Sequence, residues 1–336
     1  MSSIDNTVIS TRVRLARNIE GYPFPGHFAD EKQAREVIRH VASSMSKYSN
    51  DFNLYYMNSI SDAKAQSLVE NHLISPNLLK TRRISAALIS ADECVSIMIN
   101  EEDHLREQCI MMGLNLNEAY DRMSDCDSAL SGDMKFAYDE QLGYLTACPT
   151  NVGTGLRASV MLFLPALSLC GLMQSVSRSA SRLGLTVRGS YGEGSEAEGY
   201  TYQISNEVTL GLSEGDILSQ VHDIVMQVCD MENAQRRKLA KGDNALELKD
   251  QCMRAYGILT NCARLTSGEL QKYSAYVKLG AVLGFIPIRD VSGIDGLVIR
   301  MRPSNITDAA ERDLTATERD VYRAEQTGKF LKGLVS

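Results

Sequence analysis

Segments with strand character follow one another in this sequence, and their order limits the folds that the chain can adopt. Strand-like composition is found at Phe52 to Met57, Ile84 to Ser90, Val95 to Ile99 and Ala158 to Leu164. Asp30 to Tyr48 has apolar residues at helical spacing behind a capping Asp30, and Pro165 favours a helix start. Successive strands with helices on one side predict an α+β fold built on an antiparallel sheet, because a parallel sheet alternates regularly with helices.

The β signals fade beyond about residue 212, and the chain becomes largely helical. Ser213 to Lys238 has the spacing of a long helix, and the charged, turn-forming run Lys241 to Asn244 separates it from further helical patterns. A chain of 336 residues with 44% hydrophobic content can bury a substantial core. We therefore expect two domains, residues 1–242 and a mainly helical domain over residues 243–336.

Charge and cysteine content exclude several classes of protein. A net charge of −7 disfavours nucleic acid as the main ligand, because binding the phosphate backbone depends on a basic surface. The eight cysteines include no Cys-x-x-Cys pair, which indicates reduced thiols instead of a disulfide framework or a zinc site. The sequence has no signal-peptide pattern and no run of membrane-spanning length. These features predict a cytoplasmic protein with no membrane association.

One twelve-residue stretch suggests phosphate chemistry. Cys148 to Ser159 combines a thiol, a Gly-Thr-Gly turn and Arg157, directly before an apolar run. Glycine lets the backbone approach an anion closely, and the arginine fork matches phosphate oxygens. A strand-to-helix loop with a buried cysteine and a surface arginine explains this stretch alone equally well.

The segment Ser10 to Asn18 alternates arginine with apolar residues. In a strand, Arg12 and Arg14 point to one face, and Val13 and Leu15 point to the other. Two guanidinium groups on one face repel each other unless an anion lies between them, although a solvated strand face remains an alternative.

Two further segments are rich in acids. Asn100 to Arg106 gathers three acids, a histidine and an arginine after the strand Val95 to Ile99, where a solvated helix start is the alternative. Leu185 to Gly199 places a glycine-rich acidic loop after a strand, and Tyr200 to Ser205 reads as the next strand. Carboxylates in such a loop suit a guanidinium better than ATP phosphates, although a flexible hairpin loop is also possible. Walker-type and protein-kinase motifs are absent from the sequence, so arginines would have to replace the P-loop.

Taken in order, these segments resemble the motifs of the phosphagen (guanidino) kinase superfamily. Cys-Pro-Thr-Asn-x-Gly-Thr-Gly-x-Arg-Ala-Ser, at residues 148–159, is a highly specific signature, and the similarity covers nearly the whole chain. Within the superfamily, the sequence is most similar to the bacterial protein-arginine kinases of the McsB type. The superfamily's antiparallel sheet flanked by helices agrees with the α+β fold expected from the strand order.

Three features favour the protein-directed branch. The first arginine motif begins at residue 10, whereas kinases of free guanidino compounds carry a helical domain before it; an open site is expected as a result. Tyr191 stands where free-arginine kinases usually have an arginine. The hexamer Arg319 to Ala324 matches a motif that this family uses to bind phosphoarginine through Arg319, Asp320, Arg323 and Ala324. An exposed helix that pairs Asp320 with Arg323 at i and i+3 explains the hexamer nearly as well.

The resemblance also implies roles for individual residues. Arg12, Arg14, Arg106, Arg157 and Arg188 would bind the nucleotide phosphates, with His72 near the base. The full set of implied nucleotide contacts is Ser10, Thr11, Arg12, Val13, Arg14, His72, Arg106, Arg157, Ala158, Ser159, Val160, Met161, Arg188, Gly189, Ser190, Tyr191, Gly192 and Glu193. ATP would bring Mg²⁺ with it, so no metal-ligand set is expected in the protein.

Three residues are implied in catalysis. Glu102 and Glu193 would grip and orient the substrate guanidinium, with Glu196 as a lower-ranked alternative to Glu193. The guanidinium is protonated at any biological pH, so its nitrogens are poor nucleophiles until a carboxylate localises the charge and accepts a proton. Cys148 would lie beside the guanidinium as an electrostatic positioning group, because neighbouring arginines favour its thiolate.

The implied activity is ATP-dependent phosphorylation of protein arginines, which marks proteins for a Clp-type protease in stress response. Expected partners are arginine-bearing proteins, an activator protein, the Clp chaperone-protease and a second copy of the chain in a homodimer or higher oligomer. The alternatives are a phosphagen kinase of a free guanidino compound and a phosphoarginine-binding regulatory adaptor. The sequence departs from its relatives in its short start before the arginine motif and in the unusually basic segment Arg300 to Asn305. We expect catalysis to tolerate both changes, and oligomer geometry and regulation to be the properties that they affect.

Overall fold

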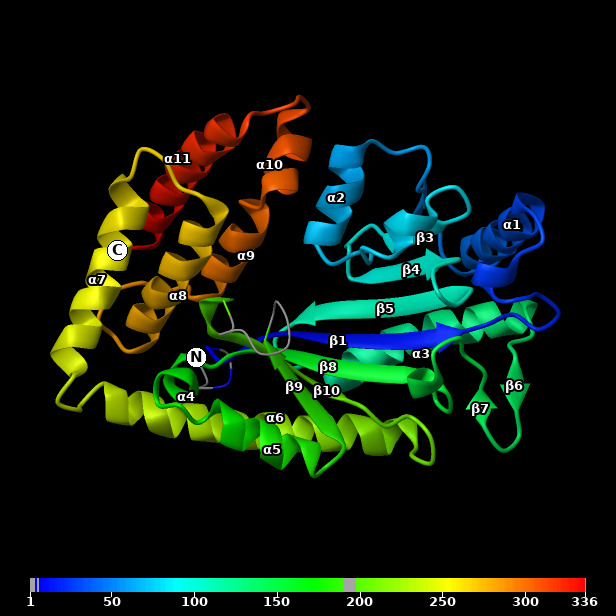
Figure 1. The fold of residues 1–336 in the computed structure, drawn as a ribbon, viewed down its shortest axis with the longest axis horizontal. Coiled ribbons are helices and arrows are strands. Elements are labelled where there is room, and N and C mark those ends of the chain that lie inside the picture. The colour runs from blue at the N-terminus through cyan, green and yellow to red at the C-terminus, as the bar shows by residue number, and fades with distance from the viewer. Residues whose placement is uncertain (1–3, 5, 190–197, 336) are drawn as a thin grey trace.

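An antiparallel sheet of eight strands lies at the centre of the molecule (Figure 1). The computed structural model describes residues 4, 6–189 and 198–335. The strands of this sheet, in spatial order, are β2 (Phe52–Tyr56), β3 (Ala86–Ser90), β4 (Val95–Ile99), β5 (Leu105–Met112), β1 (Val8–Arg17), β8 (Leu156–Phe163), β10 (Thr201–Asn206) and β9 (Leu185–Gly189). A separate hairpin is formed by β6 (Tyr138–Asp139) and β7 (Gly143–Tyr144).

Helices surround the sheet and make up the C-terminal third of the chain. They are α1 (Glu31–Tyr48), α2 (Asp62–Glu70), α3 (Leu116–Asp133), α4 (Pro165–Leu169), α5 (Met173–Ser181), α6 (Glu214–Leu239), α7 (Ala245–Asn261), α8 (Ser267–Val282), α9 (Ser292–Arg300), α10 (Pro303–Ala310) and α11 (Ala316–Leu334). Short 3₁₀ helices are η1 (Pro25–His27), η2 (Leu78–Thr81), η3 (Pro149–Asn151) and η4 (Glu198–Tyr200).

The helix starts and the antiparallel strand pairing that the sequence predicts are present in the structure. Asp30 caps α1 by accepting hydrogen bonds from the backbone N–H groups of Lys32 and Gln33, at 2.9 and 3.1 Å. Pro165 occupies the first turn of α4, where its missing N–H costs nothing. All of the strand pairs in the large sheet are antiparallel, so the predicted α+β class is confirmed.

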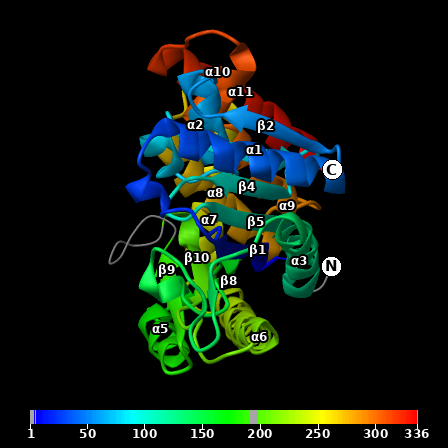
Figure 2. The ribbon, with the colours of Figure 1, turned by 90° about the vertical axis from the view of Figure 1, so that its right-hand side faces the viewer.

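The two faces of the sheet differ in chemistry. Val13 and Leu15 on β1 are 0% and 2% exposed, and they join the main hydrophobic core with residues of α1, α3 and α6. Figure 2 shows α3 and α6 on the same side of the sheet. Burying each such side chain contributes roughly 1.5–3 kcal/mol, which fixes the register of β1 and sends Arg12 and Arg14 to the opposite face.

The C-terminal helices have a core of their own. Residues of α7, α8, α9, α10 and α11 pack together, and Phe163 at the end of β8 joins them. The predicted boundary at residue 242 falls between the end of α6 and the start of α7. At the far end of this group, α10 lies beside α2 (Figure 1). Among the residues that the structure describes, none of the helices combines the length and hydrophobicity that crossing a bilayer requires.

Candidate active site

The register of the strands brings the predicted phosphate-binding arginines to one face of the sheet. Arg14 on β1 lies opposite Arg157 on β8, and Arg106 on β5 lies opposite Ala16, two residues along β1 from Arg14. Because residues two apart on a strand share a face, Arg12, Arg14, Arg106 and Arg157 all point the same way.

Arg188 extends this row to the edge of the sheet. It lies opposite Gln203 on β10, and the Gln203 Oε1 atom accepts a hydrogen bond of 3.4 Å from Arg12. Ser10, Ser159 and Met161 occupy the same face through the β1–β8 register. The cluster of five arginines that the sequence predicted is therefore assembled from four strands that lie far apart in the chain.

The five arginines form a strongly cationic surface. Burial, followed by repulsion from Arg106 and Arg157, lowers the pKa of Arg12 to about 10. Burial and repulsion from Arg12, Arg106 and Arg157 also lower the pKa of Arg14, against attraction from Glu101. Guanidinium groups this close destabilise one another unless a polyanion neutralises them, so the cluster is suited to a triphosphate.

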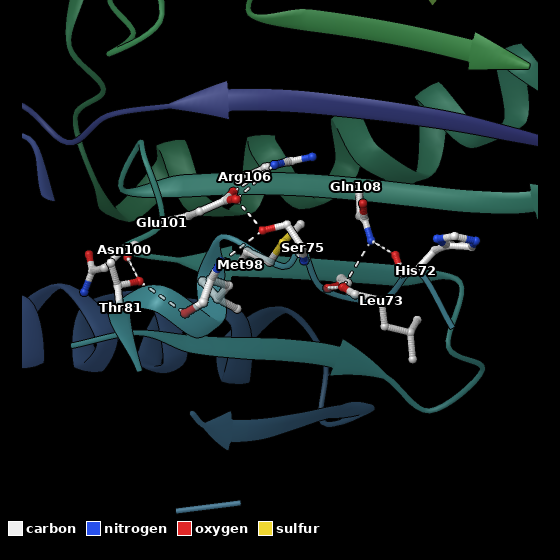
Figure 3. A network of polar contacts seen from close by, with 11 residues as sticks. His72, Leu73, Ser75, Thr81, Met98, Asn100, Glu101, Arg106 and Gln108 are labelled. Carbon is white, nitrogen blue, oxygen red and sulfur yellow. Dashed lines mark hydrogen bonds and ion pairs between the residues drawn. The ribbon is translucent and has the colours of Figure 1, made fainter. Parts of the chain in front are cut away.

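Glu101 holds one member of the cluster in place (Figure 3). Glu101 is 7% exposed, and its carboxylate accepts hydrogen bonds from Arg106 Nη1 at 2.9 and 3.1 Å and another from the Ser75 hydroxyl. Sequence reasoning missed this role, because the run Asn100 to Arg106 does not show which acid turns inward. Glu101 thus positions Arg106, while its neighbour Glu102 stays exposed.

Glu102 lies at a cavity of about 150 Å³. Arg14, Arg106, Arg157 and Cys148 line the same cavity, so a carboxylate faces the cationic cluster across a small space. Partial burial, then repulsion from Asp103 and Glu101, raises the pKa of Glu102, and Arg106 opposes the shift. A carboxylate with a raised pKa is a better proton acceptor than an ordinary one.

The loop before β8 brings Cys148 to this cavity. The Cys148 Sγ atom is 3.1 Å from the Thr150 hydroxyl oxygen. Gly155, with a φ of +67°, passes so close to β1 that a Cβ atom would lie 2.7 Å from the Ala16 carbonyl oxygen. Only glycine fits there, which explains why the turn needs this residue.

His72 lies in a second, larger pocket of about 650 Å³ that also contains Arg12 and Arg106. Its backbone has a left-handed φ of 61° and is held by Gln108, whose side-chain amide donates to the His72 and Leu73 carbonyl oxygens at 2.7 and 3.1 Å (Figure 3). Burial, then repulsion from Arg302 and Arg12, lowers the pKa of His72 to about 4, so the imidazole is neutral at pH 7. Sequence reasoning missed Gln108, whose role depends on a contact between β5 and a distant loop.

Some predicted nucleotide contacts face away from the arginine cluster. Thr11, Val13, Ala158 and Val160 alternate with the arginines and are buried on the opposite face, and the Thr11 hydroxyl donates to the Gly113 carbonyl oxygen at 2.7 Å. Their side chains therefore serve the core. Gly189 closes β9 beside Arg188. The predicted contacts at Ser190, Tyr191, Gly192, Glu193 and Glu196 lie outside the described residues.

The C-terminal hexamer lies on α11. Arg323 is 1% exposed, and its guanidinium donates to Asp320 Oδ1 at 2.7 Å and to the Met301 and Leu265 carbonyl oxygens, each at 2.8 Å. Asp320 and Arg323 form the pair that the helical alternative required, but Arg323 is buried, so the exposed helix of that alternative is wrong. Phosphoarginine binding by Arg319, Asp320, Arg323 and Ala324 stays a prediction. No cluster of three or more metal-ligating side chains occurs within residues 4, 6–189 and 198–335.

Comparison with known families accounts for most of the chain. Residues 33–235 match the model of the ATP:guanido phosphotransferase C-terminal catalytic domain. Residues 245–335 match the model of the C-terminal domain of protein-arginine kinase McsB.

Solved structures of guanidino kinases are similar in fold. Lombricine kinase superposes with a TM-score of 0.61 at 27% identity, covering 68% of this chain and 67% of its own. The duplicated taurocyamine kinase from Schistosoma mansoni, with bound transition state analog components, has a TM-score of 0.63 at 23% identity, covering 84% of this chain and 46% of its own, and supports the fold alone.

Curated relatives are similar over almost their full length. The protein-arginine kinase of Caldanaerobacter subterraneus subsp. tengcongensis is 42% identical over 95% of both chains. That of Symbiobacterium thermophilum is 44% identical over 94% of this chain and 91% of its own, and that of Geobacillus thermodenitrificans is 44% identical over 97% and 90%. The sheet, the arginine cluster and these similarities agree, and the chain belongs to the protein-arginine kinase family of ATP:guanido phosphotransferases.

Proposed function

We propose that this chain transfers the γ-phosphoryl group of ATP to the guanidinium of protein arginines, with Arg12, Arg14, Arg106, Arg157 and Arg188 binding the phosphates. The observation that carries the proposal is the alignment of these five guanidinium groups on one face of the sheet, beside a cavity that also contains Glu102. A cationic wall for the triphosphate and a carboxylate for the incoming guanidinium are the two parts that such a transfer requires.

Glu102 is assigned to the acceptor end of the reaction. It orients the substrate guanidinium, concentrates the positive charge on the nitrogens that do not react, and takes the proton released as the nitrogen–phosphorus bond forms and the bond to ADP breaks. Its raised pKa supports this role, since a stronger base accepts a proton more readily. Glu193 is proposed as the second carboxylate, with Glu196 as its alternative, and Cys148 as a positioning group beside the guanidinium.

The nucleotide end of the site is assigned to His72 and the arginine cluster. The neutral imidazole of His72 suits contact with the base, and the arginines neutralise the charge that spreads over the transferring phosphoryl group. Mg²⁺ would arrive bound to ATP and would supply positive charge at the phosphates, and no protein ligand is assigned to it.

The biological setting is also part of the proposal. Phosphorylated proteins would be degraded by a Clp-type chaperone-protease in stress response, and an activator protein would control the kinase. Residues 243–336 are proposed as a domain for dimerisation and phosphoarginine sensing through Arg319 to Ala324. A cytoplasmic location is proposed because all eight cysteines are free thiols, as is usual in a reducing compartment.

The test is phosphorylation of an unfolded, arginine-containing protein by the enzyme with Mg-ATP, followed by mass spectrometry without acid. We expect phosphoarginine with the unaltered enzyme and a decrease in kcat of about 10²- to 10⁴-fold in Glu102→Gln, because the variant cannot accept the proton. Glu140→Gln is the matched control, since this exposed acid follows β6 and does not line the cavity.

A parallel reaction on free L-arginine separates the alternatives. Product from free arginine alone would assign the chain to phosphagen synthesis, and unchanged binding of phosphoarginine proteins by an inactive Glu102→Gln variant would favour the regulatory adaptor. Full activity in Glu102→Gln would contradict the proposed role of this residue.

A further inference from the structure

The larger pocket is closed by a part of the chain that the phosphate-binding motifs do not include. Its inner wall carries Arg12, Arg106 and His72, and its outer wall is made by α8, α9 and the start of α10. Arg302, immediately before α10, lies on this outer wall. A volume of about 650 Å³ is within the range of roughly 300–1,000 Å³ that small-molecule sites occupy.

Arg302 reaches across to the His72 segment. Its Nη1 atom donates to the Glu70 carbonyl oxygen and lies 3.5 Å from His72 Nε2. A planar guanidinium has five N–H donors, and Arg302 uses only Nη1 in its hydrogen bonds to other described residues. Its Nε and Nη2 donors are therefore available to a ligand in the pocket.

Contacts between α2 and α10 fix Arg302 in this place. Both carboxylate oxygens of Glu70 accept hydrogen bonds from the Ser304 and Asn305 backbone N–H groups, at 2.9 to 3.1 Å. The Ser67 hydroxyl donates to Asn305 Oδ1 at 2.8 Å, and Lys64 pairs with Asp308 at 3.3 Å. Glu70 thus joins α10 to the loop that carries His72, two residues further along the chain.

We propose that Arg302 binds the nucleoside end of ATP, so that the C-terminal helices complete the nucleotide site. The arginine cluster takes the phosphates at one end of the pocket, and the base and ribose then lie toward Arg302 and His72 at the other. A guanidinium can stack on the face of a purine and donate to ribose or base acceptors. This inference rests on the proposed function, because it needs ATP as the ligand of the arginine cluster.

The experiment compares ATP with inorganic tripolyphosphate, which has the phosphates without the nucleoside. We expect Arg302→Ala to raise the Kd of Mg-ATP about 10- to 100-fold, as measured by calorimetry, and to leave the Kd of tripolyphosphate unchanged. The KM for ATP should rise in the same way with little change in kcat, because the lost contact stabilises bound ATP and the transition state equally.

Two further variants control for charge and folding. Arg300→Ala removes an equal charge two residues away, where the guanidinium lies 5.4 Å from the Phe330 ring centroid and does not line the pocket, so its Kd for ATP should not change. Arg302→Lys retains a donor for the Glu70 carbonyl oxygen without the planar fork. It should also raise the Kd of ATP without changing that of tripolyphosphate, and it replaces Arg302→Ala in the test if that variant does not fold.

The possible outcomes separate this inference from the proposed function. An unchanged Kd for ATP in a folded Arg302 variant, or equal weakening of ATP and tripolyphosphate, would overturn the inference alone. A wild-type protein that binds neither compound and forms no phosphoarginine would instead overturn the proposed function.

Discussion

Burial decides the charge state of individual residues in this protein, and His104 is the clearest case. It lies in the acidic segment after β4, where the sequence suggested a functional cluster, but its ring is fully buried. Nδ1 accepts from the Ile19 backbone N–H at 3.1 Å, and Nε2 is 3.0 Å from the Pro23 carbonyl oxygen, to which it donates in the neutral tautomer. Both ring nitrogens are used, so His104 supports the fold.

The titration of His104 predicts a pH dependence of stability. Burial lowers its pKa from 6.5 to about 4, against the hydrogen bond to Pro23. As the pH falls below 6.5, His104 binds a proton in the unfolded chain before it does so in the folded chain. The stability that neutral His104 contributes is therefore fully present above pH 6.5 and is lost toward pH 4. Lowering the pH from 7 to 4.5 should therefore reduce the free energy of unfolding by about 2 kcal/mol through this residue.

The measurement is urea unfolding of the wild type and His104→Gln at both pH values. Glutamine keeps a donor and an acceptor without a titrating group, so the variant should lose about 2 kcal/mol less than the wild type over this interval. His72 remains in both proteins and cancels in the comparison. Parallel losses in the two proteins would contradict the prediction.

Among the secondary-structure elements, helix α6 is joined to α4 and to the sheet by buried charged side chains. Its Glu232 carboxylate is fully buried and caps α4 by accepting from the Ala166 and Leu167 backbone N–H groups, both at 2.9 Å. Glu232 also pairs with Arg236 at 2.7 Å, and Arg236 donates to the Phe163 carbonyl oxygen at 2.9 Å. One buried ion pair therefore joins α6, α4 and the end of β8.

Glu232→Ala should destabilise the protein strongly. Removing the carboxylate leaves Arg236 buried without its partner and uncaps α4, and such losses cost about 3–5 kcal/mol. Chemical denaturation measures the change, with the exposed Asp230→Asn on the same helix expected to stay within about 0.5 kcal/mol. A loss of less than 1 kcal/mol for Glu232→Ala would show that this pair does not brace the helix.

Most elements follow from local sequence, and the exceptions have a physical cause. Alternation predicted the two faces of β1, and capping predicted α1. Strand β5 was not predicted, because Glu107 and Gln108 are buried within it and hide its pattern. Burial, then repulsion from Asp127, raises the pKa of the buried Glu107 carboxyl.

At the scale of the whole molecule, Arg323 connects the C-terminal helices. Two of its three hydrogen bonds tie α11 to the loop before α8 and to the end of α9, the third pairs it with Asp320 on α11, and its side chain is among the largest that are fully buried. Arg319, on the same helix, is half-buried and donates to the Leu314 carbonyl oxygen at 2.7 Å. Arg323 therefore contributes more to the packing of the C-terminal helices than Arg319 does.

Arg323→Gln should weaken the C-terminal helices in the absence of any phosphoarginine. Leaving two buried carbonyl groups and Asp320 without a donor costs about 2–5 kcal/mol, whereas Arg319→Gln should cost less than about 1 kcal/mol. Hydrogen exchange over residues 245–335 measures both. Equal protection in the two variants would contradict this assignment. If the prediction holds, Arg319→Gln is the cleaner variant for testing phosphoarginine binding.

The sequence by itself determined the fold class and the family, and its motifs identified the five arginines that the strand register then brings to one face. These depend on strand alternation, caps and specific motifs, which act over a few residues. Only the tertiary structure decided that Glu101 positions Arg106 while Glu102 stays exposed, that Arg323 is buried, and that Arg302 reaches the His72 segment. These outcomes depend on which distant elements pack together. Burial and pairing are properties of that packing, so no local pattern in the chain contains them.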